Sequence, residues 1–142
     1  KPKFLVWASA DSLGAPLQRI QIIKGWLENG NHKEKVFDVV CSDGLMVDSS
    51  NFRCPDNGAK VNIENCKVSE NLGASELKSF WEDPDFLKDQ EAFYYVRVLE
   101  NPVCRWSTWD SIRAGYKPRS DIPATIQERA WTSPIWFEPT KS

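Results

Sequence analysis

The stretch LQRIQIIKGWLENGNHKEKVFDVVC, residues 17–41, predicts the fold more directly than any other part of the sequence. Apolar and β-branched residues alternate, or nearly alternate, with polar ones over residues 17–27 and again over 35–41, which is typical of half-buried strands. Asn29-Gly30 between them is a strong hairpin signal, because both residues tolerate the positive φ of a tight turn. We therefore predict two antiparallel strands joined as a hairpin.

Further strand signals with a period of two lie at residues 4–7, 60–66 and 92–99. The segment AFYYVRVL, residues 92–99, is the strongest of them because it is almost entirely aromatic and β-branched. Residues 74–81 fit either a strand or one or two helical turns. The segment ERAWTSPIWF, residues 128–137, resumes strand character, and Pro134 restricts it to an edge or a bulge. We expect it to lie in the sheet beside residues 92–99, with its apolar side chains buried.

The segment NPVCRWSTWDSIRAG, residues 101–115, predicts a corner between a strand and a short helix. Ser107 or Thr108 can cap a helix over residues 109–114, and Gly115 follows its end. Many strands, one or two short helices and irregular loops indicate a mainly β fold, an antiparallel β-sandwich of the immunoglobulin-like or a similar kind. We expect residues 1–142 to form one such domain, since a chain of this length buries roughly 70% of its unfolded surface.

Two residues of this corner are candidates for binding, Arg105 and Trp106. Tryptophan and arginine are enriched at the energetic centres of binding surfaces, and both also fill buried corners. We expect Trp109 to be largely buried against the sheet and Arg105 to face a partner. The simpler explanation, which needs no partner, is that Arg105 stacks on an indole or pairs with a carboxylate such as Asp110.

The four cysteines predict two disulfides: Cys41, Cys54, Cys66 and Cys104. They show no C-x-x-C spacing, and a single histidine leaves too few ligands for a usual zinc site. Four cysteines permit three pairings, of which we choose Cys41 with Cys54 across a polar loop and Cys66 with Cys104. Disulfides imply an oxidising location, periplasmic or extracellular. The alternative is four buried thiols in a cytosolic protein.

Composition excludes several classes of protein. The hydrophobic fraction of 41% and the seven tryptophans exclude disorder. The net charge of -2, without a block of lysine and arginine, argues against a nucleic-acid partner. No apolar run approaches the ~20 residues of a membrane helix, so we expect no membrane partner. The beginning, KPKFLVWASA, has too short an apolar run for a signal peptide, and we interpret the chain as an excised fragment.

Four stretches, taken in order, resemble a known family: PLQRIQIIKGWLENG, DPDF, AFYYVRVLENPVCRW and IQERAWTSPIW. They are similar to the C-terminal part of a bacterial domain-of-unknown-function family related to the PHP (polymerase and histidinol phosphatase) metal-dependent phosphoesterases. The resemblance covers nearly the whole chain. It implies a longer, exported parent protein whose upstream metal-binding part is rich in His and Asp. No residue of this chain corresponds to those ligands, so none is assigned as one.

The inventory of reactive side chains predicts no catalysis by this chain alone. Hydrolysis of the PHP type needs several His and carboxylate ligands around metal ions, whereas His32 is the only histidine and lies in the predicted hairpin turn. No G-x-S-x-G elbow and no glycine-rich phosphate loop is present. We therefore predict no metal site and no cofactor.

Two groups of carboxylates remain as alternatives. Glu82, Asp83 and Asp85 cluster around a proline, where a turn is the simpler explanation. A polar loop carries further oxygen ligands that calcium could use, without the spacing of an EF-hand: Asp43, Asp48 and Asp56.

Two functional hypotheses follow. The first is a non-catalytic accessory β-sandwich that packs against the upstream catalytic domain of the same polypeptide. The second is a stand-alone secreted module that binds a carbohydrate or another planar ligand on four tryptophans: Trp106, Trp109, Trp131 and Trp136. An exposed row of these tryptophans favours the module, and a buried row favours the accessory domain. We prefer the first, because Trp26, Trp131 and Trp136 lie on predicted sheet faces, where core filling is the commoner use.

Overall fold

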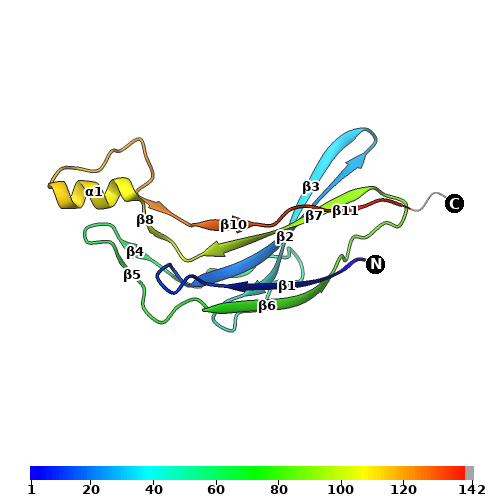
Figure 1. Ribbon diagram of the computed structural model, residues 1–142, viewed down its shortest axis with the longest axis horizontal. Helices are drawn as coiled ribbons and strands as arrows, with labels where there is room; N and C mark the ends of the chain where they lie inside the picture. Colours follow the sequence, from blue (N-terminus) through cyan, green and yellow to red (C-terminus); the bar gives the residue numbers. More distant parts are fainter. Residues whose placement is uncertain (140–142) are drawn as a thin grey trace.

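The computed structural model describes residues 1–139 and is mainly β (Figure 1). Its main sheet is antiparallel and has the strand order β10-β7-β2-β3, with β11 also paired to β7. The strands of this sheet are β2 (Leu17–Glu28), β3 (Asn31–Cys41), β7 (Ala92–Glu100), β10 (Arg129–Trp131) and β11 (Ile135–Phe137). The predicted hairpin is confirmed, and so is the position of residues 128–137 beside β7.

The hairpin turn is tighter than the sequence predicts. Glu28 already pairs with Asn31, so the strands are joined by two residues only. Both of them have a positive φ, 52° for Asn29 and 76° for Gly30, which suits the right-handed twist of the flanking strands. The second strand was predicted to begin at residue 35. It begins at Asn31 instead, because the polar residues before residue 35 also pair with β2.

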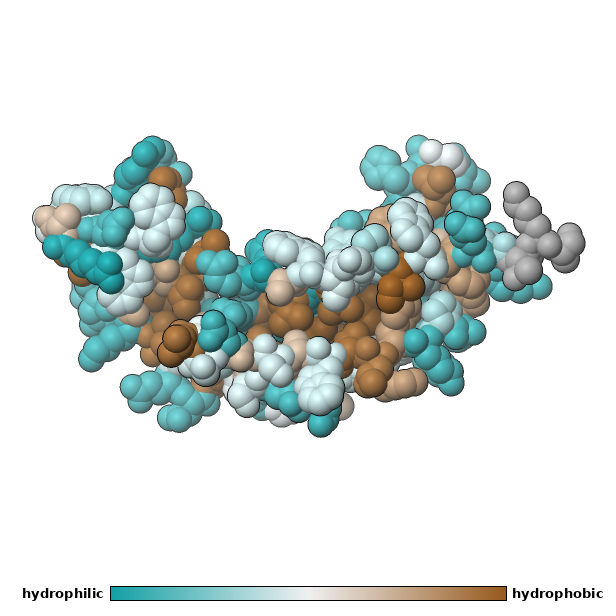
Figure 2. Space-filling view, viewed as in Figure 1, coloured by the Kyte–Doolittle hydropathy of each residue, from teal (hydrophilic) through white to brown (hydrophobic). Residues whose placement is uncertain are grey.

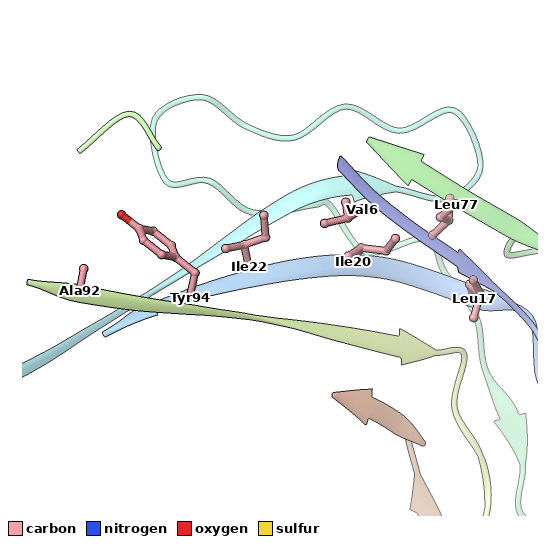
Figure 3. Close-up of a cluster of buried hydrophobic side chains, with 7 residues drawn as sticks. All are labelled: Val6, Leu17, Ile20, Ile22, Leu77, Ala92 and Tyr94. Carbon is pink, nitrogen blue, oxygen red and sulfur yellow. The ribbon is translucent and has the colours of Figure 1, made fainter. Parts of the chain in front are cut away.

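A second layer covers one side of the main sheet. It consists of β1 (Lys3–Ser9) paired with β6 (Glu76–Glu82), which settles residues 74–81 as strand rather than helix. Figure 3 shows the side chains that fill the space between the layers: Val6, Leu17, Ile20, Ile22, Leu77, Ala92 and Tyr94. Two antiparallel layers with an apolar core between them agree with the predicted β-sandwich.

An ion pair lies inside this core. Lys24 Nζ donates to Asp83 Oδ2 at 2.6 Å and to the carbonyl oxygen of Asp85 at 2.8 Å. The Tyr94 hydroxyl donates to the same carboxylate at 2.7 Å. Burial, together with this hydrogen bond, raises the pKa of Tyr94 far above its ordinary value. Each polar atom of the cluster thus has a partner, as buried charges require.

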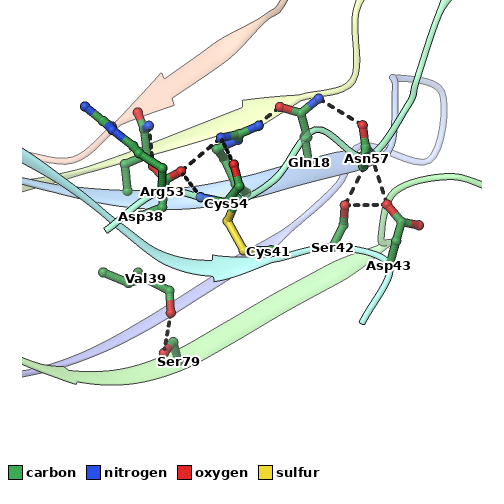
Figure 4. Close-up of a disulfide and its surroundings, with 12 residues drawn as sticks. Gln18, Asp38, Val39, Cys41, Ser42, Asp43, Arg53, Cys54, Asn57 and Ser79 are labelled. Atoms are coloured by element: carbon green, nitrogen blue, oxygen red, sulfur yellow. Dashed lines mark hydrogen bonds and ion pairs between the residues drawn. A yellow bond between two sulfur atoms is a disulfide. The ribbon is translucent and has the colours of Figure 1, made fainter. Parts of the chain in front are cut away.

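The two disulfides are Cys41–Cys54 and Cys66–Cys104, the pairing expected from the sequence. Their Cα–Cα distances are 5.7 and 5.6 Å, within the usual range. The first closes the polar loop after β3 (Figure 4). The second joins a small ribbon to the strand before the helix. All four cysteines are thus bonded, and the alternative of free thiols is wrong.

Two minor ribbons flank the sandwich. One pairs β4 (Val61–Asn62) with β5 (Lys67–Val68), and the other pairs β8 (Val103–Cys104) with β9 (Thr125–Ile126). The strand predicted over residues 60–66 was thus too long. Its alternation is broken by a turn between the two short strands, in which Cys66 has a φ of 55°.

Helix α1 (Trp106–Ala114) begins three residues earlier than predicted. Its N-cap is Arg105, and residues 1–139 supply no side-chain cap, so Ser107 and Thr108 lie inside the helix. Gly115 follows the last turn with a φ of 70°, as predicted. Within the described part of the chain, no helix has the length and apolar character needed to cross a membrane.

Candidate functional site

We call the side of the main sheet away from β1 and β6 the outer face, and within residues 1–139 no other sheet forms a layer over it. In Figure 1, helix α1 and the β2–β3 turn lie at its two ends. Figure 2 shows the surface hollowed between them. Because side chains alternate between the two faces of a strand, the register identifies which aromatic residues lie here: Phe93, Tyr95, Trp131 and Trp136.

One cross-strand row of the outer face is built around a glycine. Trp136 pairs with Phe93, Phe93 with Gly25, and Gly25 with Glu34. The Phe93 ring lies over Gly25 so closely that an added Cβ would be 2.3 Å from its ring carbon Cζ. The centroids of the Phe93 and Trp136 rings are 5.1 Å apart, with the planes tilted by 49°. The glycine therefore makes room for the Phe93 ring close to the strand backbone.

A pocket of about 450 Å³ opens over this row, and we call it the Gly25 pocket. By strand alternation, the strand residues whose side chains face it are Leu27, His32, Glu34, Phe93 and Trp136. Glu91 and Glu138, each next to a strand end, also line it. Aromatic and aliphatic groups make up its floor, and three carboxylates lie at its edges. This volume is within the range of small-molecule sites.

A smaller pocket, of about 230 Å³, lies near the helix end of the outer face, and we call it the Arg105 pocket. Arg105, Arg129 and Trp131 line it together with Gln127. The Nε atom of Arg105 is buried, and no atom of residues 1–139 accepts a hydrogen bond from it. A buried donor without an acceptor is rare in native proteins. Of the two predicted binding residues, Arg105 therefore borders a pocket, whereas Trp106 is exposed on the helix.

Buried polar groups lie on the same face, around the Cys41–Cys54 disulfide (Figure 4). The fully buried carboxylate of Asp38 has four partners: Gln21 Nε2 at 2.6 Å, the Cys54 amide at 2.7 Å, Arg19 Nη1 at 2.9 Å and Arg53 Nη1 at 3.5 Å. Arg97 Nε in turn donates to Gln21 Oε1 at 2.7 Å. With its oxygens fully engaged, this carboxylate holds the disulfide loop on the sheet.

The tryptophans correct two sequence predictions. Trp109 is 38% exposed, with the Arg113 guanidinium over its ring, so it does not fill the space between helix and sheet. Thr108 and Ser111 are the buried helix residues instead. Trp131 and Trp136 are exposed as well, because their register places them on the outer face.

Other residues follow the predictions in part. Trp26 is half-buried and packs against the core. Ile135 is exposed although we expected its burial, and Phe137 is half-buried against Phe86, with ring centroids 4.9 Å apart. Phe93, Gly25 and Glu34 were not singled out from the sequence. The signal available in the sequence was Gly25 itself, because a glycine inside a strand often marks a place where another group packs closely against the backbone.

The acidic cluster before β7 does not converge on one site. Glu82 pairs with Lys3 at 3.0 Å, Asp83 with Lys24, and Asp85 with Lys35. The hydrogen bond and charge of Lys3 lower the pKa of Glu82. Pro84 and Asp85 lie in a turn that the Asp83 carboxylate closes by accepting from the Asp85 amide, as the turn interpretation expects, whereas Glu82 ends β6.

The three loop aspartates also have separate local partners. Burial opposes ionisation of Asp43, but hydrogen bonds from Ser42, Asn57 and the Gly73 amide outweigh it and lower its pKa. Asp48 accepts hydrogen bonds from the amide and the hydroxyl of Ser50. Asp56 accepts a hydrogen bond from the Gly58 amide. These bonds close turns. Residues 1–139 contain no group of three His, Cys, Asp or Glu side chains placed to hold a metal ion.

These features define a disulfide-bonded, antiparallel β protein with an uncovered aromatic sheet face. Residues 1–139 match the family described as Protein of unknown function (DUF3604), and the chain belongs to this family. Searches of the curated proteins and of the solved structures give no match to the chain.

Proposed function

We propose that the chain is a non-catalytic accessory β-sandwich of a longer, exported bacterial protein related to the PHP metal-dependent hydrolases. It forms the C-terminal part of that protein and packs against the upstream catalytic domain. The observation that carries this proposal is an apolar patch on the far side of the β1–β6 layer: Leu5, Trp7 and Phe80.

The patch is continuous across the two strands. Leu5 pairs directly with Phe80, and the two side chains are 72% and 65% exposed. Trp7 follows on the same face, with the Lys78 ammonium 5.8 Å from its ring centroid. A contiguous group of large apolar side chains in water is uncommon and marks an interaction surface. A sheet face of another domain, or a loop from it, would remove these side chains from water.

The partners of the reactive groups support a non-catalytic role. The carboxylates considered for catalysis accept hydrogen bonds or ion pairs that fix turns and strand ends. His32 is exposed beside the hairpin turn. The two disulfides support a periplasmic or extracellular location, where thiols are oxidised. The metal-dependent chemistry then belongs to the upstream domain.

Hydroxyl-radical footprinting tests the docking directly. Oxidation of Trp7 and Phe80 is compared between the chain alone and the longer polypeptide, with Met46 as the control because it is exposed elsewhere. We expect Trp7 and Phe80 to be protected in the longer polypeptide only, while Met46 stays reactive in both. Equal oxidation of Trp7 and Phe80 in the two proteins would contradict docking through this patch.

A phosphoesterase assay tests the absence of catalysis. The chain alone and the longer polypeptide are assayed on phosphate mono- and diesters with manganese, zinc or iron. We expect hydrolysis only with the longer polypeptide. Turnover by the chain alone that survives repurification, and that is lost on Asp85→Asn, would overturn the accessory role.

The second candidate function is a ligand-binding module. A specific observation favours it: Trp106, Trp109, Trp131 and Trp136 are all exposed, which is the outcome expected of a binding module. The outer face that carries Trp131 and Trp136 lies on the opposite side of the sandwich from the β1–β6 patch. The two candidates therefore use different surfaces, and one protein can have both functions.

A further inference from the structure

We propose that the Gly25 pocket binds an alkylated ammonium group, such as the trimethylammonium group of choline. This inference rests on the ligand-binding candidate and is independent of docking through the β1–β6 patch. Three properties of the pocket carry it: the orientation of its aromatic rings, the sign of its charge and its size.

The aromatic rings provide the attraction for a cation. The Phe93 ring packs closely over Gly25, and the centroid of the Trp136 ring is 5.1 Å from its centroid, with the two planes tilted by 49°. A cation over the face of an aromatic ring is attracted by the negative π-surface, and tryptophan is the strongest such partner. Two rings inclined to each other, rather than coplanar, form two walls of a recess for a rounded, methylated cation.

The charges of the pocket select against an anion. Glu34, Glu91 and Glu138 line it, and within residues 1–139 none of them has a lysine or arginine at ion-pair distance. Lys33 also lines the pocket, but it pairs with Trp26, and strand alternation points both side chains toward the opposite face. Of the basic residues that line the pocket, His32 is the one whose side chain faces it. The pocket therefore gathers negative charge around an apolar floor.

The size and lining fit an alkylated ammonium better than a compact, strongly hydrated cation. About 450 Å³ accommodates a trimethylammonium group and part of the molecule that carries it. The side chains of Phe93, Trp136 and Leu27 contain no hydrogen-bond acceptor, so on this part of the lining nothing replaces the water around a bare ion, and the acceptors of the pocket are its three carboxylates. Methyl groups need no such replacement and gain from contact with the rings.

A pair of matched probes tests the proposal by NMR titration of the folded chain. Choline is compared with its neutral isostere, in which a tert-butyl group replaces the trimethylammonium group. We expect saturable shifts of the Trp136 indole N–H and the Gly25 amide with choline, and binding of the isostere that is weaker by about 5-fold or more. Equal binding of the two probes, or no saturable shift with choline, would overturn the proposal.

Variants place the binding in the pocket. Trp136→Ala and Glu34→Gln are each expected to weaken choline binding by about 3-fold or more, and Trp136→Tyr is expected to restore part of it. The matched controls are Trp131→Ala and Glu128→Gln, because both residues line the Arg105 pocket and neither lines the Gly25 pocket. Their affinity should equal that of the unaltered chain.

Unchanged choline affinity in a folded Trp136→Ala variant would contradict the proposal. If Trp136→Ala lowers the melting temperature, the choline affinity of Glu34→Gln decides instead, and an unchanged affinity in that variant would contradict the proposal. The β1–β6 patch variant Phe80→Ser should bind choline normally. Loss of docking and loss of ligand binding are thereby distinguished.

Discussion

Lys24 and Asp83 form an ion pair in the core, with 3% and 0% of their side chains exposed. We predict that Lys24→Met lowers the free energy of unfolding by about 3–5 kcal/mol, because the Asp83 carboxylate is left buried without its counter-ion. Urea unfolding measures the change. Lys78→Met is the control, since Lys78 is exposed beside Trp7, and it should cost under about 1 kcal/mol.

The double variant Lys24→Met, Asp83→Leu separates the cost of an unpaired charge from the value of the pair. Replacing both partners of a buried pair by apolar residues is often close to neutral. We expect it to recover most of the stability lost in Lys24→Met. A double variant that is no more stable than Lys24→Met would contradict this account.

The disulfides should differ in their contribution to stability. Cys66–Cys104 spans 38 residues and Cys41–Cys54 spans 13, and a longer closed loop restricts the unfolded chain more. We expect Cys41→Ser with Cys54→Ser to cost about 3 kcal/mol, and Cys66→Ser with Cys104→Ser to cost somewhat more, about 4 kcal/mol. Thermal unfolding under non-reducing conditions gives both values. Mass mapping of the unreduced protein should find no free thiol.

Gly25→Ala should destabilise the protein by about 1–3 kcal/mol, because the new methyl group displaces the Phe93 ring. In a Phe93→Ala background the same substitution should cost little, and a double-mutant cycle measures the difference. An equal cost in both backgrounds would show that the ring is not what requires a glycine. Gly30→Ala is a useful comparison, since its added Cβ meets no atom within 4 Å and only its φ of +76° opposes the change.

The Asp43 carboxylate should make stability depend on pH in the acid range. Its pKa is lowered from the ordinary value of 3.8, by hydrogen bonds that outweigh the effect of burial. The folded protein therefore binds this proton less readily than the unfolded chain. The resulting stabilisation is present above pH 3.8 and is lost as the pH falls through the folded-state pKa.

Melting temperatures measured from about pH 6 down to about pH 2.5, a range that brackets an ordinary carboxyl pKa, test this prediction. The Asp43→Asn variant should lose less stability over the acid part of this range than the unaltered protein. Asp11→Asn serves as a control at an exposed turn. Parallel pH profiles of Asp43→Asn and the unaltered protein would contradict the assignment.

The sequence predicted the elements better than it predicted which side chains they bury. Asn29-Gly30 determined the hairpin because its backbone preference is local. The aromatic and β-branched residues of 92–99 likewise indicated a strand without reference to anything else. The exposure of Trp131 and Trp136 depended on their register against β7 and on what covers that face, and neither is encoded locally.

The candidate site was predictable only in part. Arg105 was selected by residue type, and it does border a pocket. The Gly25 pocket was not found, because it joins Gly25 and Glu34 of the β2–β3 hairpin to Phe93 of β7 and Trp136 of β11, two strands that lie far from the hairpin in the sequence. The glycine in the strand signalled a close neighbour, but only the fold identified that neighbour as Phe93.

The Cys66–Cys104 bond has a further consequence for proteolysis. The connection between β6 and β7 carries an exposed Lys88 that a trypsin-like protease can reach. A cut there separates the chain into two pieces, yet the bond still joins them, because its two cysteines lie on either side of the cut. Nicked protein would thus migrate as an intact chain on a non-reducing gel. It would fall into two fragments only after reduction, so the bond makes this exposed connection tolerant of cleavage.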